Sequence, residues 1–97
     1  MKRSNDQSLK EILAHLVKRD GMKQPLYEVE IREIWLREMG DYINKYTRYI
    51  RLRGHVLEIG ITSAGLRDEL GYSKKKITSF LNDQLGEEVI RDVILRH

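Results

Sequence analysis

The sequence predicts an α+β domain, with elements in the order α-α-β-β-α-β and helices covering a small three-stranded sheet. Three changes of pattern along the chain support this fold class. Apolar residues recur at helical spacing up to residue 46, alternate with polar residues between 48 and 62, and return to helical spacing between 66 and 85. A helical stripe and one face of a sheet can share a core, and 97 residues suffice for one modest core.

Two helices are expected before the sheet. Ser8 and Glu11 form a capping box, and Asp20-Gly21 supplies a stop after an apolar stripe. The stripe consists of Leu9, Ile12, Leu13, Leu16 and Val17. Residues 1–8 are polar and are predicted to be a flexible N-terminus, while residues 9–97 are predicted to form a single domain.

Pro25 suits the first turn of a second helix, whose apolar arc extends to Tyr46 if the helix continues through Gly40. A glycine inside a helix costs about 1 kcal/mol relative to alanine. We therefore expect Gly40 to mark a close helix contact or a kink. Trp35 shares this arc with Met39 and Ile43, which favours a core anchor over a ligand platform.

The alternating stretch predicts a hairpin. A strand from Arg48 to Arg53 has one apolar side and one wet side, and Gly54 allows a tight turn after it. The apolar side holds Ile50 and Leu52, and the wet side holds Tyr49, Arg51 and Arg53. In the second strand Leu57, Ile59 and Ile61 alternate with Val56, Glu58, Gly60 and Thr62.

The segment from Leu66 to Leu85 has helical spacing, and Gly71-Tyr72-Ser73 would allow it to be split into two shorter helices. Both alternatives bury the same leucines. Gly86 ends the segment, and a final strand containing Val89, Val93 and Leu95 follows. The residues predicted for the structural core are Trp35, Met39, Gly40, Leu66, Leu70 and Leu81.

The composition argues against several classes of function. Without cysteine the chain has no disulfide, thiolate metal site or cysteine nucleophile, and it has no apolar run of signal-peptide or transmembrane type. His15, His55 and His97 fall on three different elements with no metal-ligand spacing. We therefore predict a cytoplasmic protein that is not an enzyme, with no catalytic residues, metal, cofactor or membrane association.

Basic residues gather in two windows that contain no acidic residue, one between Asp41 and Glu58 and one between Glu69 and Asp83. With a net charge of +3, these windows suggest contacts with a polyanion. The predicted nucleic-acid-binding residues are Lys45, Arg48, Tyr49, Arg51, Arg53, Lys74, Lys75 and Lys76. In this interpretation the arginines contact phosphates and Tyr49 offers a platform for a base. The alternatives are a charged strand edge that prevents unwanted pairing and a solvated group of lysines.

Trp35 with Met39-Gly40, the hairpin, the segment Ser63 to Leu70 and Leu85-Gly86 together resemble the DciA family of bacterial replicative-helicase partners, a match of roughly Leu9 to Arg96. The resemblance implies a K-homology-like folded domain that binds the replicative helicase, and DNA, during helicase loading. Gly71-Tyr72-Ser73-Lys74 lies where a K-homology domain carries its Gly-x-x-Gly clamp. The second glycine is missing, so we do not expect nucleotides to be gripped there in the usual way.

These observations lead to three alternative hypotheses for the function. The first is a binding module that engages the replicative DNA helicase and contacts single-stranded DNA weakly and in a salt-dependent manner. The second is a stand-alone K-homology-like protein that binds RNA or DNA. The third is a structural adaptor that forms a homodimer through its sheet edge or its tyrosines, for which Tyr27 and Tyr72 are suited by their places at element ends.

Overall fold

The computed structural model of this chain describes residues 23–97. Its elements are α2 (Lys23–Glu38), α3 (Gly40–Lys45), β1 (Thr47–Arg53), β2 (Val56–Ile61), α4 (Ala64–Gly71), α5 (Lys74–Leu85) and β3 (Asp92–Arg96). The α+β class and the helix-covered, three-stranded sheet are confirmed. The helix predicted after Ser8, and the N-terminal segment predicted to be flexible, lie outside the described residues.

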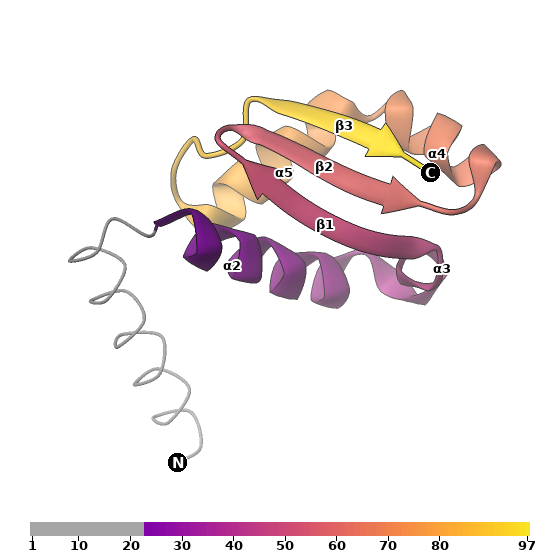
Figure 1. Ribbon diagram of the computed structural model, residues 1–97, viewed down its shortest axis with the longest axis horizontal. Coiled ribbons are helices and arrows are strands. Elements are labelled where there is room, and N and C mark those ends of the chain that lie inside the picture. The colour runs from indigo at the N-terminus through magenta and orange to yellow at the C-terminus, as the bar shows by residue number, and fades with distance from the viewer. Residues whose placement is uncertain (1–22) are drawn as a thin grey trace, which may run out of the picture.

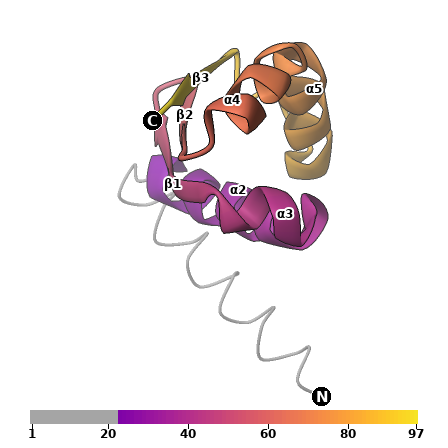
Figure 2. The ribbon, with the colours of Figure 1, turned by 90° about the vertical axis from the view of Figure 1, so that its right-hand side faces the viewer.

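The sheet has the order β1-β2-β3 and is mixed. β1 and β2 form the predicted antiparallel hairpin, which turns at Gly54 with a φ of 61°, whereas β2 and β3 are parallel. Parallel neighbours need a long crossover, and the helix pair α4 and α5 supplies it. Figure 1 looks onto the sheet with these two helices behind it, and Figure 2 shows them together on one side.

One face of the sheet packs on the helices to form the core. Leu57, Ile59 and Ile61 of β2 are fully buried there, and the tryptophan of α2, Trp35, is only 1% exposed. The indole Nε1–H of Trp35 donates to the hydroxyl of Thr47 at 3.1 Å, which satisfies its polar atom inside the core. Helix α2 is thereby anchored to the start of β1.

The second helix does not continue through Gly40, since α2 ends at Glu38 and α3 begins at Gly40. Gly40 has a φ of 85°, a left-handed conformation that stops the hydrogen bonding of a helix. The side-chain amide of Asn44 then donates to the carbonyls of Trp35 and Gly40, at 3.3 and 2.8 Å. No atom lies within 4 Å of the position a Cβ would take on Gly40, so the glycine marks a break and not a close helix contact.

Two predictions about this region need correction. Gly40 is exposed and does not belong to the core, because the break turns it toward solvent. Met39, also predicted for the core, is half-buried and packs against the edge of the core. The other residues predicted for the core, Trp35, Leu66, Leu70 and Leu81, are between 0% and 8% exposed.

The segment from Leu66 to Leu85 forms two helices, which was one of the two alternatives that the sequence allowed. Helix α4 starts with the Ser63 hydroxyl accepting from Leu66 N–H at 3.2 Å, and it ends at Gly71. Only Tyr72 and Ser73 separate it from α5, which ends at Leu85 and is followed by Gly86 with a φ of 83°. β3 starts at Asp92, so Val89 lies before the final strand and not within it. It is buried nevertheless, and its backbone N–H donates to the Asn82 side chain at 3.1 Å.

Candidate nucleic-acid interface

The face of the sheet opposite the helices, which we call the open face, is built from alternate residues of all three strands. Ladder pairs such as Tyr49 with Gly60 and Gly60 with Arg96 place these residues side by side. The open face consists of Tyr49, Arg51, Arg53, Val56, Glu58, Gly60, Asp92, Ile94 and Arg96. Figure 1 views the molecule from this side.

Tyr49 and Arg51 of β1 are stacked on the open face. The Tyr49 ring lies against Gly60, so closely that a Cβ on Gly60 would come within 2.3 Å of the ring carbon Cε2. The Arg51 guanidinium carbon lies over the same ring, 4.7 Å from its centroid, in a cation–π arrangement. The ring that the sequence analysis proposed as a platform for a base is thus already stacked with a guanidinium.

Glu58 ties this stack to the third strand. Its carboxylate accepts from the Tyr49 hydroxyl at 2.8 Å and pairs with Nε of Arg96 at 3.3 Å. The hydrogen bond from Tyr49 lowers the pKa of Glu58, and the same bond raises the pKa of Tyr49. At neutral pH Glu58 is therefore ionised, on a face that also carries Arg51, Arg53 and Arg96.

Arg48 and Lys45 lie beside the open face, near the start of β1. Arg48 sits where the register shifts between Thr47 and Tyr49, and its Nη1 donates to the backbone oxygen of His97 at 3.4 Å. A shallow hollow of about 260 Å³ beside it is lined by Arg32, Thr47, Arg48, Tyr49 and Ile50. Lys45 ends α3, with its ammonium 5.5 Å from the centroid of the Tyr46 ring.

Lys74, Lys75 and Lys76 form the first turn of α5, in the helical layer. All three are exposed, and the neighbouring Tyr72 at the α4–α5 junction is 89% exposed. Because the helices cover the opposite side of the sheet, the structure separates these lysines from the arginines of the open face. The predicted binding residues thus fall into two groups that a flat ligand cannot touch together.

Glu58, Gly60 and Arg96 are parts of this site that the sequence did not predict. The alternation of apolar and polar residues in β2 already placed Glu58 and Gly60 on the wet side of the strand. That position is the signal that could have identified these two residues. Arg96 reaches Glu58 only because β3 is parallel to β2, with Ile94 paired to Glu58 and Arg96 paired to Gly60. Nothing in the sequence pattern of a single five-residue strand specifies that partner or direction.

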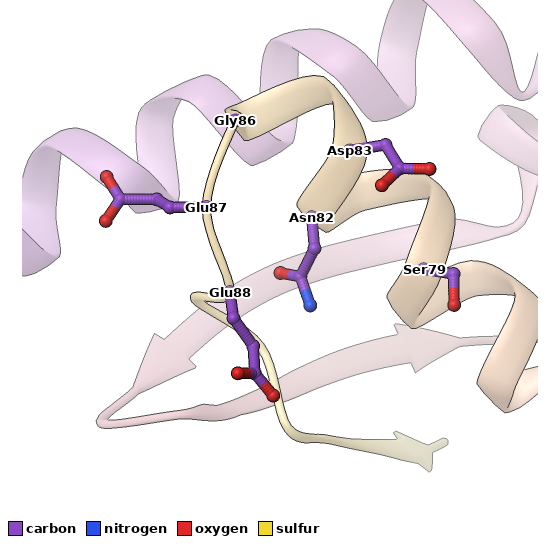
Figure 3. A pocket seen from close by; sticks show the side chains of 6 residues that line it. All are labelled: Ser79, Asn82, Asp83, Gly86, Glu87 and Glu88. Carbon is purple, nitrogen blue, oxygen red and sulfur yellow. The ribbon is translucent and has the colours of Figure 1, made fainter.

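A hollow of about 430 Å³ lies at the end of α5 and is acidic. It is lined by Ser79, Asn82, Asp83, Gly86, Glu87 and Glu88. Figure 3 shows the three carboxylates pointing in different directions, and the Tyr27 hydroxyl donates to Glu87. That bond raises the pKa of Tyr27 to about 12. Within residues 23–97 no group of three or more histidines and carboxylates is arranged to hold a metal ion.

In the described part of the chain, no helix has the length and apolar character needed to cross a membrane. None of the curated proteins compared with the chain matches it. A family model does match, over residues 8–95, and its description is "Dna[CI] antecedent, DciA". The family consists of partner proteins of the replicative helicase, which implies a role associated with helicase loading. Because the match covers nearly the whole length, the chain belongs to the DciA family.

Proposed function

We propose that this protein is a non-enzymatic binding module that engages the replicative helicase and contacts single-stranded DNA through the open face, assisting helicase loading. The observation that carries the DNA contact is the Arg51 guanidinium stacked over the Tyr49 ring beside Arg53. A planar guanidinium held in one place can bind a phosphate or stack on a base. Arg51, and not the tyrosine ring, is then the planar group that the nucleic acid meets first.

The charges of the open face favour weak binding. Arg51, Arg53 and Arg96 supply three cations, while Glu58 and Asp92 supply two carboxylates. For a single strand, each neutralised phosphate contributes about −0.7 to the slope of log affinity against log salt concentration. Three contacts predict a slope of about −2, which is shallower than a surface of uniform positive charge would give.

The remaining predicted residues form separate contacts in this proposal. Arg48 and Lys45 extend the open face past the start of β1. Lys74, Lys75 and Lys76 offer a second set of phosphate contacts in the helical layer. A DNA strand that contacts both the open face and the lysines must pass around an edge of the sheet. A short oligonucleotide therefore engages one set of residues, and a longer one engages both.

The test of the DNA contact is fluorescence anisotropy with a labelled single-stranded oligonucleotide. Arg51→Glu is the informative variant, and Arg37→Glu is its matched control because Arg37 is exposed on α2 and pairs only locally, with Glu38 at 3.0 Å. Both variants change the net charge equally. The proposal requires Arg51→Glu to weaken binding at least tenfold and Arg37→Glu to leave it within about twofold. Equal losses would mean that total charge, and not the open face, determines binding.

The helicase contact is tested by size-exclusion chromatography of the protein with its own replicative helicase, without DNA. Co-elution would support the proposed engagement and show that DNA is not required for it. Repeating the experiment with Arg51→Glu tests whether the helicase and DNA bind to the same surface of the protein. Separate elution at micromolar concentrations would contradict direct engagement and favour the general nucleic-acid-binding alternative.

A further inference from the structure

The outward-pointing backbone groups at the two edges of the sheet have different hydrogen-bond partners. On β1 the outward-pointing backbone groups are occupied by side chains of α2. Glu28 accepts from the N–H of Leu52 at 2.8 Å, and Arg32 donates to the carbonyl of Ile50 at 3.0 and 3.2 Å. Glu28 and Arg32 also pair with each other at 2.9 Å. A further strand could not bond to β1 without displacing this ion pair, so that edge is closed.

On β3 the outward-pointing groups belong to Val93 and Leu95. The N–H of Asp92 points toward β2, where the carbonyl of His55 accepts at 3.3 Å, and backbone direction alternates along a strand. The Val93 N–H donates to the carboxylate of its own neighbour Asp92, at 2.9 Å. Among the described residues no strand lies beyond β3. This edge therefore offers a row of backbone groups to a partner.

The sequence of β3 shows which partner fits. It runs from Asp92 to Arg96 with three apolar residues between, so its two ends carry opposite charges. We propose that a second copy of this chain pairs with β3 in the antiparallel direction, with Ile94 opposite Ile94 of the second copy. Asp92 then faces Arg96 of the second copy, and Arg96 faces its Asp92, on the open face.

This register is the one that satisfies both hydrogen bonding and charge. Val93 becomes the direct partner of Leu95 of the second copy, and both already direct their backbone groups outward. A shift by one residue would place the outward backbone groups of Val93 and Leu95 opposite backbone groups of the second copy that are already bonded to its own β2. A shift by two residues keeps the hydrogen bonds but leaves the charged ends opposite apolar residues or solvent. Opposite charges directly across an antiparallel pair stabilise it, and like charges destabilise it.

Pairing exchanges contacts without burying an unpaired charge. The Val93 N–H passes from the Asp92 carboxylate to a carbonyl of the second copy, and that carboxylate turns to the facing arginine. Two three-stranded sheets join into one, and their open faces become continuous. Because the paired strands are only five residues long, the association is weak and depends on protein concentration.

The test is sedimentation equilibrium of the full chain from about 1 μM to 1 mM. The wild type is expected to form a dimer reversibly within that range. Asp92→Arg and Arg96→Asp each place like charges opposite one another, so each alone should weaken self-association at least about tenfold. An equimolar mixture of the two variants restores both opposite-charge pairs and should form a heterodimer.

A wild type that stays monomeric throughout would overturn the proposal. Single variants that self-associate as well as the wild type would overturn pairing through β3, and a mixture that fails to associate would overturn the register. Because Arg96 also pairs with Glu58, circular dichroism must show that Arg96→Asp is folded. If it is not, Leu95→Pro provides the second variant. It removes an outward N–H that the monomer does not need for its ladder, and it should abolish dimers.

Discussion

The two basic groups of this protein differ in how their charges are held. On the open face the Arg51 guanidinium is stacked on Tyr49, Tyr49 is bonded to Glu58, and Glu58 is paired with Arg96. In the first turn of α5 the three lysines are exposed, and the structure gives their ammonium groups no partner among the described residues. An ordered guanidinium loses little freedom when it binds, whereas a free lysine must be ordered at that moment. The open face can therefore position a ligand, while the lysines mainly add attraction.

Removing the core that both groups share is expected to have the largest effect. Trp35→Ala deletes a fully buried indole and should lower the free energy of unfolding by about 3–5 kcal/mol. Urea denaturation followed by circular dichroism measures it. Leu36→Ala is the matched control, because Leu36 is 70% exposed on the same helix and should cost less than about 1 kcal/mol. Similar losses for both variants would contradict the assignment of Trp35 as the anchor.

Charge reversal compares the two basic groups directly. Arg51→Glu with Arg53→Glu should weaken binding of a short single-stranded oligonucleotide roughly 100-fold, since two charge-assisted contacts are lost. Lys74→Glu with Lys75→Glu makes the same change in net charge and should weaken it less than about tenfold. Anisotropy titrations at a fixed salt concentration measure both. A larger loss for the lysine variant would reverse the ranking of the two groups.

Gly60→Ala tests whether the stacking of Arg51 on Tyr49 contributes to oligonucleotide binding independently of the charge of the open face. The added methyl group would collide with the Tyr49 ring and displace it from beneath Arg51. We expect the oligonucleotide affinity to fall about tenfold although no charge changes. In a Tyr49→Leu background the same substitution should have no further effect, because the ring is already gone. An equal loss in both backgrounds would show that Gly60 acts through the fold and not through the tyrosine.

Glu58→Gln is expected to act in the opposite direction. Removing the negative charge at the centre of the open face should strengthen oligonucleotide binding by about two- to fivefold and steepen its salt dependence. The amide can still accept from Tyr49, so the stack is retained. Salt titrations of the two proteins provide the measurement, and weaker binding by the variant would mean that the carboxylate positions Arg96 productively.

The smallest effect concerns pH. The pKa of Tyr27 in the folded protein is about 12, above the usual value of 10. A raised pKa means that the contribution of the Tyr27–Glu87 bond to stability is complete below pH 10 and is lost as the pH rises toward 12. The absorbance of tyrosinate should show a late titration phase that Tyr27→Phe reduces. Glu58 behaves in the opposite way, because its lowered pKa makes its contribution present at neutral pH and lost in acid.

Local patterns were sufficient to predict most elements. The alternation in residues 48–62 identified the buried and wet sides of both hairpin strands, and the structure confirms Ile50 and Leu52 as buried and Arg51 and Arg53 as exposed. The site was predicted less well. Four of the residues proposed to bind nucleic acid lie on or beside the open face through β1, but the lysines of α5 do not join them. The separation depends on which side of the sheet the helices occupy, and spacing along the chain does not specify that side.

What the sequence determined by itself is the order of helical and extended segments and the apolar side of the hairpin, because hydrophobic spacing is a property of neighbouring residues. It also determined the family. Only the tertiary structure decided that the helix breaks at Gly40, that β3 lies parallel to β2, and that Tyr49 rests on Gly60 beneath Arg51. The parallel pairing of β3 and the stack on Gly60 depend on residues far apart in the chain meeting in one register. That register follows from packing of the whole domain and cannot be read from any local pattern.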